Sequence, residues 1–185
     1  MSTSAAPAAP LRLSQQFVHA LHAVLDRELG AESARVLQEI GASAGEGLWN
    51  DFVPWLEREY GVAEPGELDA GYLGEVVSRF LAEAGWGSVA VNELGTAVLA
   101  LDSADWAEAD PSRGGPYPSC QLACGLLADF LSRLGGGAIA VLEVECRSRG
   151  DAHCRFLAAN PAVLDRVYAA IAEGRDYLAE ALGAR

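Results

Sequence analysis

The chain has 185 residues, 51% hydrophobic and 21% charged, with a mean hydropathy of +0.14. This composition is typical of one soluble globular domain and conflicts with disorder, collagen-like repeats and coiled coil. The 13 basic residues stand against 26 acidic ones, so we expect no unaided binding to nucleic acid and no adhesion to an anionic membrane. All 13 basic residues are arginine, which excludes a lysine Schiff base, pyridoxal-phosphate chemistry and a phosphate-binding loop ending in GK[ST].

The beginning of the chain has no features of a targeting segment. Met1–Pro10 lacks both a basic start and an apolar core, which predicts a disordered arm rather than a signal peptide. The longest apolar runs, such as Ala138–Leu142, are far shorter than the roughly 18 residues that span a bilayer. We therefore expect a cytoplasmic protein with its four cysteines reduced, serving as ligands, nucleophiles or core residues.

The first half of the chain is helical in pattern. Apolar residues at helical spacing predict helices over 11–29, 31–48, 48–60 and 68–84. Gly30 ends the first of them, and Gly61 with the turn Glu64-Pro65-Gly66 ends the third.

The second half alternates strands with helices. Two strands over 86–94 and 96–102 form a hairpin around Gly95, and a loop over 103–118 leads into a helix over 119–134 that carries Cys120 at its start. A second hairpin follows over 138–146 and 153–158, and a closing helix over 161–182 begins at Pro161. This order predicts an α+β fold with an antiparallel sheet, in a single domain over 11–185 that follows the arm over 1–10.

Three of the four cysteines are placed to meet in space. Cys146 ends one strand of the second hairpin and Cys154 begins the other, so the turn brings their sulfurs together, and Cys120 at a helix start can complete the group. Zinc takes about four tetrahedral ligands from Cys, His and carboxylate side chains, so a fourth ligand is needed.

Four residues compete for the fourth position, and spacing alone does not decide between them: Cys124, Glu143, Glu145 and His153. Cys124 lies one helical turn after Cys120. Strand alternation places Glu143 and Glu145 on the face opposite to Cys146, so either of them requires a bulge or a twist at the strand end.

This part of the chain resembles the 4-vinyl reductase domain, which occurs in bacteriochlorophyll-synthesis proteins and in the sensor domains of phenol- and xylene-responsive transcription activators. The likeness covers about 11–158, and its specific part is 120–156. The residues that carry it are Pro118-Ser119-Cys120, Glu143-x2-Cys146-x7-Cys154-Arg155-Phe156, Gly150-Asp151 in the turn, and Gly85-Trp86-Gly87 at the entry to the first hairpin.

The resemblance implies a bacterial protein, usually dimeric, with a fold like that of the small TRAPP subunits of vesicle tethering. In the aromatic-sensing members, three Cys and one Glu at this spacing hold a structural zinc. Carried over, the zinc ligands are Cys120, Glu143, Cys146 and Cys154, in a closed site that pins the second hairpin to a helix. The resemblance therefore favours Glu143 over Cys124.

The resemblance is weaker at the ligand site. The sensing members read a phenol hydroxyl with a His and a Trp, whereas the matching strand, 97–101, offers neither. We expect a largely apolar cavity for a hydrophobic, aromatic or tetrapyrrole molecule, with His19 and His22 outside it. The candidate cavity residues are Tyr72, Phe80, Trp86, Leu99, Leu101, Phe130 and Val141.

These patterns predict a binding or sensing module rather than an enzyme. The chain has neither a G-x-G-x-x-G nucleotide fingerprint nor a G-x-S-x-G nucleophile setting. With no ATPase or DNA-binding domain in the sequence, we expect a free-standing homodimer that acts through a protein partner. Two alternatives are an assembly protein, on a faint likeness to the cellulose synthase D subunit, and an accessory in bacteriochlorophyll vinyl-group reduction, on the family name.

Overall fold

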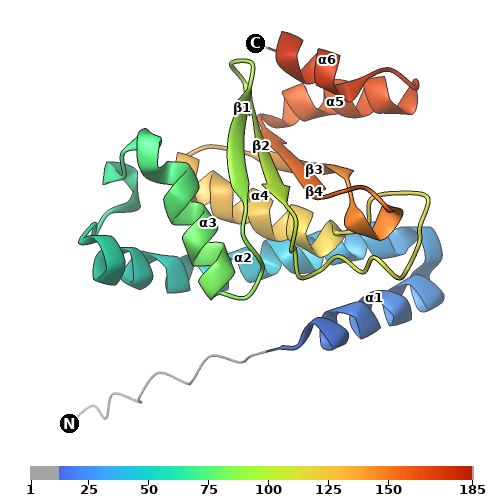
Figure 1. Ribbon diagram of the computed structural model, residues 1–185, viewed down its shortest axis with the longest axis horizontal. Coiled ribbons are helices and arrows are strands. Elements are labelled where there is room, and N and C mark those ends of the chain that lie inside the picture. The colour runs from blue at the N-terminus through green and yellow to red at the C-terminus, as the bar shows by residue number, and fades with distance from the viewer. Residues whose placement is uncertain (1–12, 185) are drawn as a thin grey trace.

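The computed structural model describes residues 13–184, so the predicted arm at Met1–Pro10 lies outside the described residues (Figure 1). The expected α+β class with an antiparallel sheet is confirmed. The helices are α1 (Gln15–Leu29), α2 (Ser33–Tyr60), α3 (Leu73–Glu83), α4 (Gln121–Gly135), α5 (Pro161–Ala172) and α6 (Tyr177–Gly183), and the strands are β1 (Ala90–Leu94), β2 (Val98–Ser103), β3 (Ala140–Glu145) and β4 (Cys154–Ala159).

The two predicted hairpins join into one sheet with the strand order β1-β2-β4-β3. β2 and β4 are its inner strands and pair antiparallel, with Leu101 opposite Phe156. Residues alternate between the two faces of each strand, so Leu101 and Phe156 face the larger core, while Ala100 and Leu157 face a smaller core under α5 and α6. Helices therefore cover both faces of the sheet.

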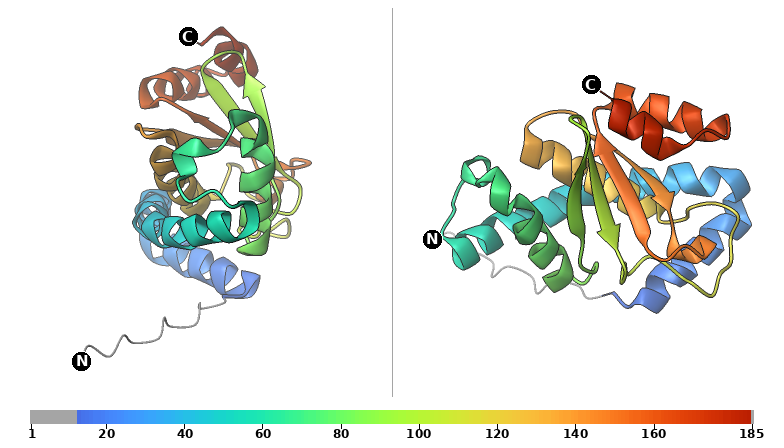
Figure 2. Two further views of the ribbon diagram at one scale, coloured as in Figure 1. Left: turned by 90° about the vertical axis from the view of Figure 1, so that its left-hand side faces the viewer. Right: turned by 45° about the horizontal axis from the view of Figure 1, so that its top comes forward.

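The larger core lies between the sheet and the helices α2, α3 and α4. Its centre is a group of aromatic rings in which Phe52 and Phe80 meet at 5.0 Å between centroids, and Phe52 and Phe130 at 5.1 Å. Both contacts are edge-to-face, the arrangement that aromatic quadrupoles favour. α1 and the pair α5–α6 lie at opposite ends of the molecule in each view (Figures 1 and 2).

The predicted helices over 31–48 and 48–60 are wrong as separate elements, because α2 runs unbroken through both. Leu48, Phe52 and Trp55 continue one buried face across the expected boundary. Pro54 lies inside the helix, and tertiary packing of this face outweighs its lost hydrogen bond.

The predicted closing helix over 161–182 is also wrong as a single element. It is two helices, because Gly174 adopts a left-handed φ of 72° after α5 and the side chain of Asp176 caps α6. α3 starts later than expected, since short 3-10 turns occupy Pro65–Glu67 and Ala70–Tyr72. None of the described helices is long and apolar enough to cross a membrane.

α2 and α4 cross at two glycines with backbone against backbone. A Cβ added to Gly41 would lie 2.0 Å from the carbonyl oxygen of Leu122, and one added to Gly125 would lie 1.9 Å from that of Gln38. No real Cβ approaches so closely, so any side chain at either position must push the two helices apart. This crossing holds α4 in the position from which it reaches the sheet.

We predict that Gly41→Ala lowers the free energy of unfolding by about 2–3 kcal/mol through this overpacking. Gly47→Ala is the matched control, because Gly47 lies on the exposed side of the same helix with nothing within 4 Å of an added Cβ. Alanine there should stabilise by up to about 1 kcal/mol. Equal effects of the two changes in urea unfolding would contradict the close crossing.

Candidate metal centre

A break in the pairing of β3 with β4 brings Glu143 and Cys146 to the same side of the sheet. Glu143 pairs with Phe156 and Glu145 pairs with Arg155, so Val144 is an extra residue in β3. The bulge that the spacing required is therefore present, and it separates the two glutamates. Glu143 is buried on the larger-core side, whereas Glu145 contacts Arg155 on the other.

The turn after β3 holds Cys146 and Cys154 in place. The backbone N–H of Cys146 donates to Oδ2 of Asp151 at 2.7 Å, and the guanidinium of Arg149 donates to the same oxygen. Gly150 takes a left-handed φ of 103° between them. The N–H of Arg147 then donates to Sγ of Cys154 at 3.5 Å, so the turn presents donors to this sulfur.

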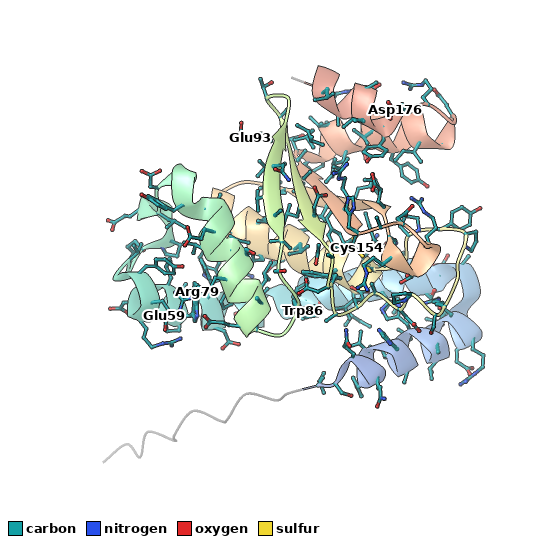
Figure 3. The ribbon with its side chains drawn as sticks, in the orientation of Figure 1. Glu59, Arg79, Trp86, Glu93, Cys154 and Asp176 are labelled. Atoms are coloured by element: carbon teal, nitrogen blue, oxygen red, sulfur yellow. The ribbon has the colours of Figure 1, made fainter. Side chains whose placement is uncertain are left out.

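The third cysteine comes from the N-terminal end of α4, where Cys120 is the cap residue. Its backbone N–H donates to Oε2 of Glu143 at 2.7 Å, which ties the helix start to β3. The figure shows Cys154 where the sheet ends beside this helix (Figure 3). Segments far apart in the sequence thus supply one buried group.

The four side chains converge closely enough to hold a metal ion. The ligand atoms of Cys120, Glu143, Cys146 and Cys154 all lie within 4.8 Å of one another, and all four residues are buried. The sulfur of Cys120 lies 3.8 Å from that of Cys146 and 4.0 Å from that of Cys154. Two sulfurs at about 2.3 Å from one zinc ion stand about 3.8 Å apart in a tetrahedron.

Charges in this group also favour a cation. Burial and the neighbouring Cys146 thiolate raise the pKa of Glu143 to about 9, and its Oε1 is buried without a hydrogen-bond partner. Hydrogen bonds to Cys146 raise the pKa of Cys120 well above its usual value, while those same bonds lower the pKa of Cys146. Four anionic ligands can be buried together only around a cation, which also gives Oε1 its missing partner.

The start of α4 depends on a carboxylate that sequence reasoning missed. Both oxygens of Glu108 accept backbone N–H groups there, from Leu122 at 2.9 Å and from Ala123 at 2.7 Å. Nε2 of His22 lies 2.8 Å from the same carboxylate. A lone acid twelve residues before a cysteine gives no local signal, because the loop between them brings it back to the helix.

The other three candidates for the fourth ligand lie apart from the converging group. Cys124 is buried one turn along α4, and its ligand atom is outside the group. Glu145 and His153 contact each other at 3.3 Å on the opposite face of the sheet, in a network with Asp102 and Arg155. The arrangement thus favours Glu143.

The candidate cavity residues fall into three groups. Phe80, Leu101 and Phe130 are buried in the larger core. Trp86, Leu99 and Val141 are half-buried and pack against it. Tyr72 is 62% exposed, so it does not join them.

Residues 107–159 match the family model of the 4-vinyl reductase domain, which confirms the resemblance seen in the sequence. The match contains the four converging residues and the capping carboxylate of Glu108. No curated protein matches the chain.

Three solved structures share the fold. The phenol-responsive sensory domain of the transcription activator PoxR with phenol aligns with a TM-score of 0.63 and 20% identity, over 82% of this chain and 76% of that one. A trafficking protein particle complex subunit 3 from Naegleria fowleri, covalently bound to palmitic acid, gives 0.58 and 11%, over 78% and 93%. A vinyl-4-reductase family protein from Methanocaldococcus jannaschii gives 0.50 and 15%, over 80% and 82%.

We predict that Cys146→Ser loses bound metal and soluble protein together, because the group then lacks one ligand. Cys124→Ser is the matched control, since Cys124 is equally buried and lies outside the group. Metal per chain, measured by elemental analysis after gel filtration, should stay at one ion in the control. A stable, normally folded Cys146→Ser protein would argue against the site.

Proposed function

We propose that this protein is a binding or sensing domain for a small hydrophobic molecule, stabilised by a structural zinc ion and acting as a homodimer through a protein partner. The observation that carries the proposal is the match to the 4-vinyl reductase domain together with the fold, which a phenol-binding sensory domain and a palmitate-bound subunit share. Both relatives hold apolar or aromatic molecules, which supports a ligand of that class here.

Zinc suits the donor set because three thiolates and one carboxylate are typical of its tetrahedral sites. All four ligands are buried, so a closed site leaves no position for substrate or water. Zinc there would supply a fixed positive charge that holds the end of the β3–β4 hairpin against the start of α4. Its role is therefore stability rather than catalysis.

The ligand would lie between the sheet and the helices α3 and α4, among the apolar side chains of the larger core. One polar group in this core is available to it. The indole N–H of Trp106 is fully buried and has no hydrogen-bond partner. Trp106 stacks on Trp86 at 5.8 Å and meets Phe156 at 5.3 Å, so a ligand oxygen reaching it would orient an otherwise apolar molecule.

One observation favours the alternative of an assembly protein. Phe52, Phe80 and Phe130 lie in mutual contact, with centroids 5.0 to 5.9 Å apart, so rings already occupy the middle of this core. A protein whose core is filled would use the same fold only for contacts with other subunits.

Native mass spectrometry of protein purified without added metal tests both parts of the proposal. We expect a dimer that carries one zinc ion per chain and an additional small mass. Zinc without added mass, together with failure to bind an apolar dye, would favour assembly over ligand binding. Absence of any metal would overturn the structural role of zinc.

We predict that Val141→Phe lowers ligand occupancy at least tenfold by filling space on the larger-core side of β3. Leu142→Phe is the matched control, because Leu142 is the next residue of the same strand and packs against the opposite core. Apolar-dye fluorescence and mass spectrometry measure the occupancy. Equal loss in both variants would show general damage to the sheet and would count against a ligand site on the α3–α4 side.

A further inference from the structure

A separate, polar cavity lies between α1 and the segment that leads from β2 into α4. Its volume is about 150 Å³, and it is lined by side chains of α1, of the segment 108–119 and of Ser148. None of the apolar candidate residues contributes to it. Engineered protein cavities of this size take up molecules as large as benzene, which has six heavy atoms.

The acidic groups around the cavity are held in fixed positions by the protein. Asp26 is paired with Arg113, and Glu108 accepts two N–H groups of α4. Asp110 accepts the N–H and the hydroxyl of Ser112, and these hydrogen bonds lower the pKa of Asp110, so it stays ionised.

Two imidazoles of α1 complete the lining, one turn apart on the same helix face. His22 is 3% exposed, and its Nε2 forms no hydrogen bond although it lies 2.8 Å from Oε1 of Glu108. Nε2 of His19 is also buried without a hydrogen-bond partner, and its Nδ1 lies 3.9 Å from Oδ2 of Asp110. Buried ring nitrogens without partners are costly, so they indicate a missing ligand or solvent molecule.

The charge of the lining is negative. Three carboxylates face one guanidinium, which leaves two uncompensated negative charges while both imidazoles are neutral. An anion would meet this charge in a confined space, whereas a cation with several N–H donors would be attracted and could hydrogen-bond.

We propose that this cavity binds a small organic cation with a primary ammonium group. Its N–H donors would reach the carboxylate of Asp110 and an imidazole nitrogen, and its short alkyl part would lie against Ala23. Such a molecule would bridge α1 and the segment that enters α4 two residues after Ser119. The inference goes beyond the proposed function, because the cavity and the hydrophobic site share no residue.

The chain's three histidines make the test specific, because two line the cavity and His153 lies outside it. We would titrate labelled, full-length protein with ethylammonium chloride at fixed pH and follow the assigned imidazole proton signals by NMR. Saturable shifts of His19 and His22, with His153 unmoved, are the expected result. Sodium chloride, ethanol and sodium acetate at the same concentrations should produce no such saturation.

Asp110→Asn tests the charge while keeping an oxygen that can accept the N–H of Ser112. We expect ethylammonium to bind at least about tenfold more weakly, as for a lost hydrogen bond to a charged group. Asp176→Asn is the matched control, because Asp176 likewise accepts the N–H two residues on and caps α6 at the far end of the molecule (Figure 3).

The titration of the unaltered protein decides the matter even if a variant fails to fold. No saturable shift of His19 and His22, or an equal shift with acetate, would overturn the proposal. A response to Zn²⁺ alone would also overturn it, by making the cavity a metal site. None of these outcomes depends on whether a hydrophobic ligand is found, so the two proposals fail separately.

Discussion

Three thiols and a carboxylate buried at one point, where α4 meets the end of the β3–β4 hairpin, set the constraint on which this structure depends. Such groups resist burial as anions, and Glu143 keeps an unpartnered oxygen among them. Each feature nearby contributes to their convergence. The bulge at Val144 turns Glu143 inward, Asp151 and Gly150 shape the turn, and Glu108 binds the start of α4.

The crossing of α2 with α4 is the second requirement, because it determines where the start of α4 can lie. Gly41 and Gly125 allow the two backbones to touch, so α4 lies close along α2 while its other side faces the sheet. The long α2 also carries Phe52 into the aromatic centre. Packing of this kind leaves little freedom to move α4 without opening the core.

The molecule separates its polar and apolar chemistry. The larger core is apolar apart from groups such as the indole N–H of Trp106, whereas α1 meets the segment before α4 through imidazoles, carboxylates and a guanidinium. Glu108 connects the two regions, because it lies beside His22 and also binds the N-terminal end of α4. A change at α1 therefore has a short physical path to the thiol group.

Local patterns in the sequence determined much of this protein. Apolar periodicity and turn residues predicted the α+β class and both hairpins, and the spacing of Cys146 and Cys154 predicted that their sulfurs meet. They failed at 48 in α2 and near Gly174, because continued burial overrides small residues in one place and a left-handed glycine ends a helix in the other.

Tertiary structure alone decided the rest. Strand alternation left Glu143 and Glu145 on one face, and only the register shift against β4 separated them. The cavity at His19 and His22 likewise depends on a loop that folds back onto α1. Contacts between residues far apart in the sequence leave no periodic trace in it, because their positions depend on packing against the rest of the fold.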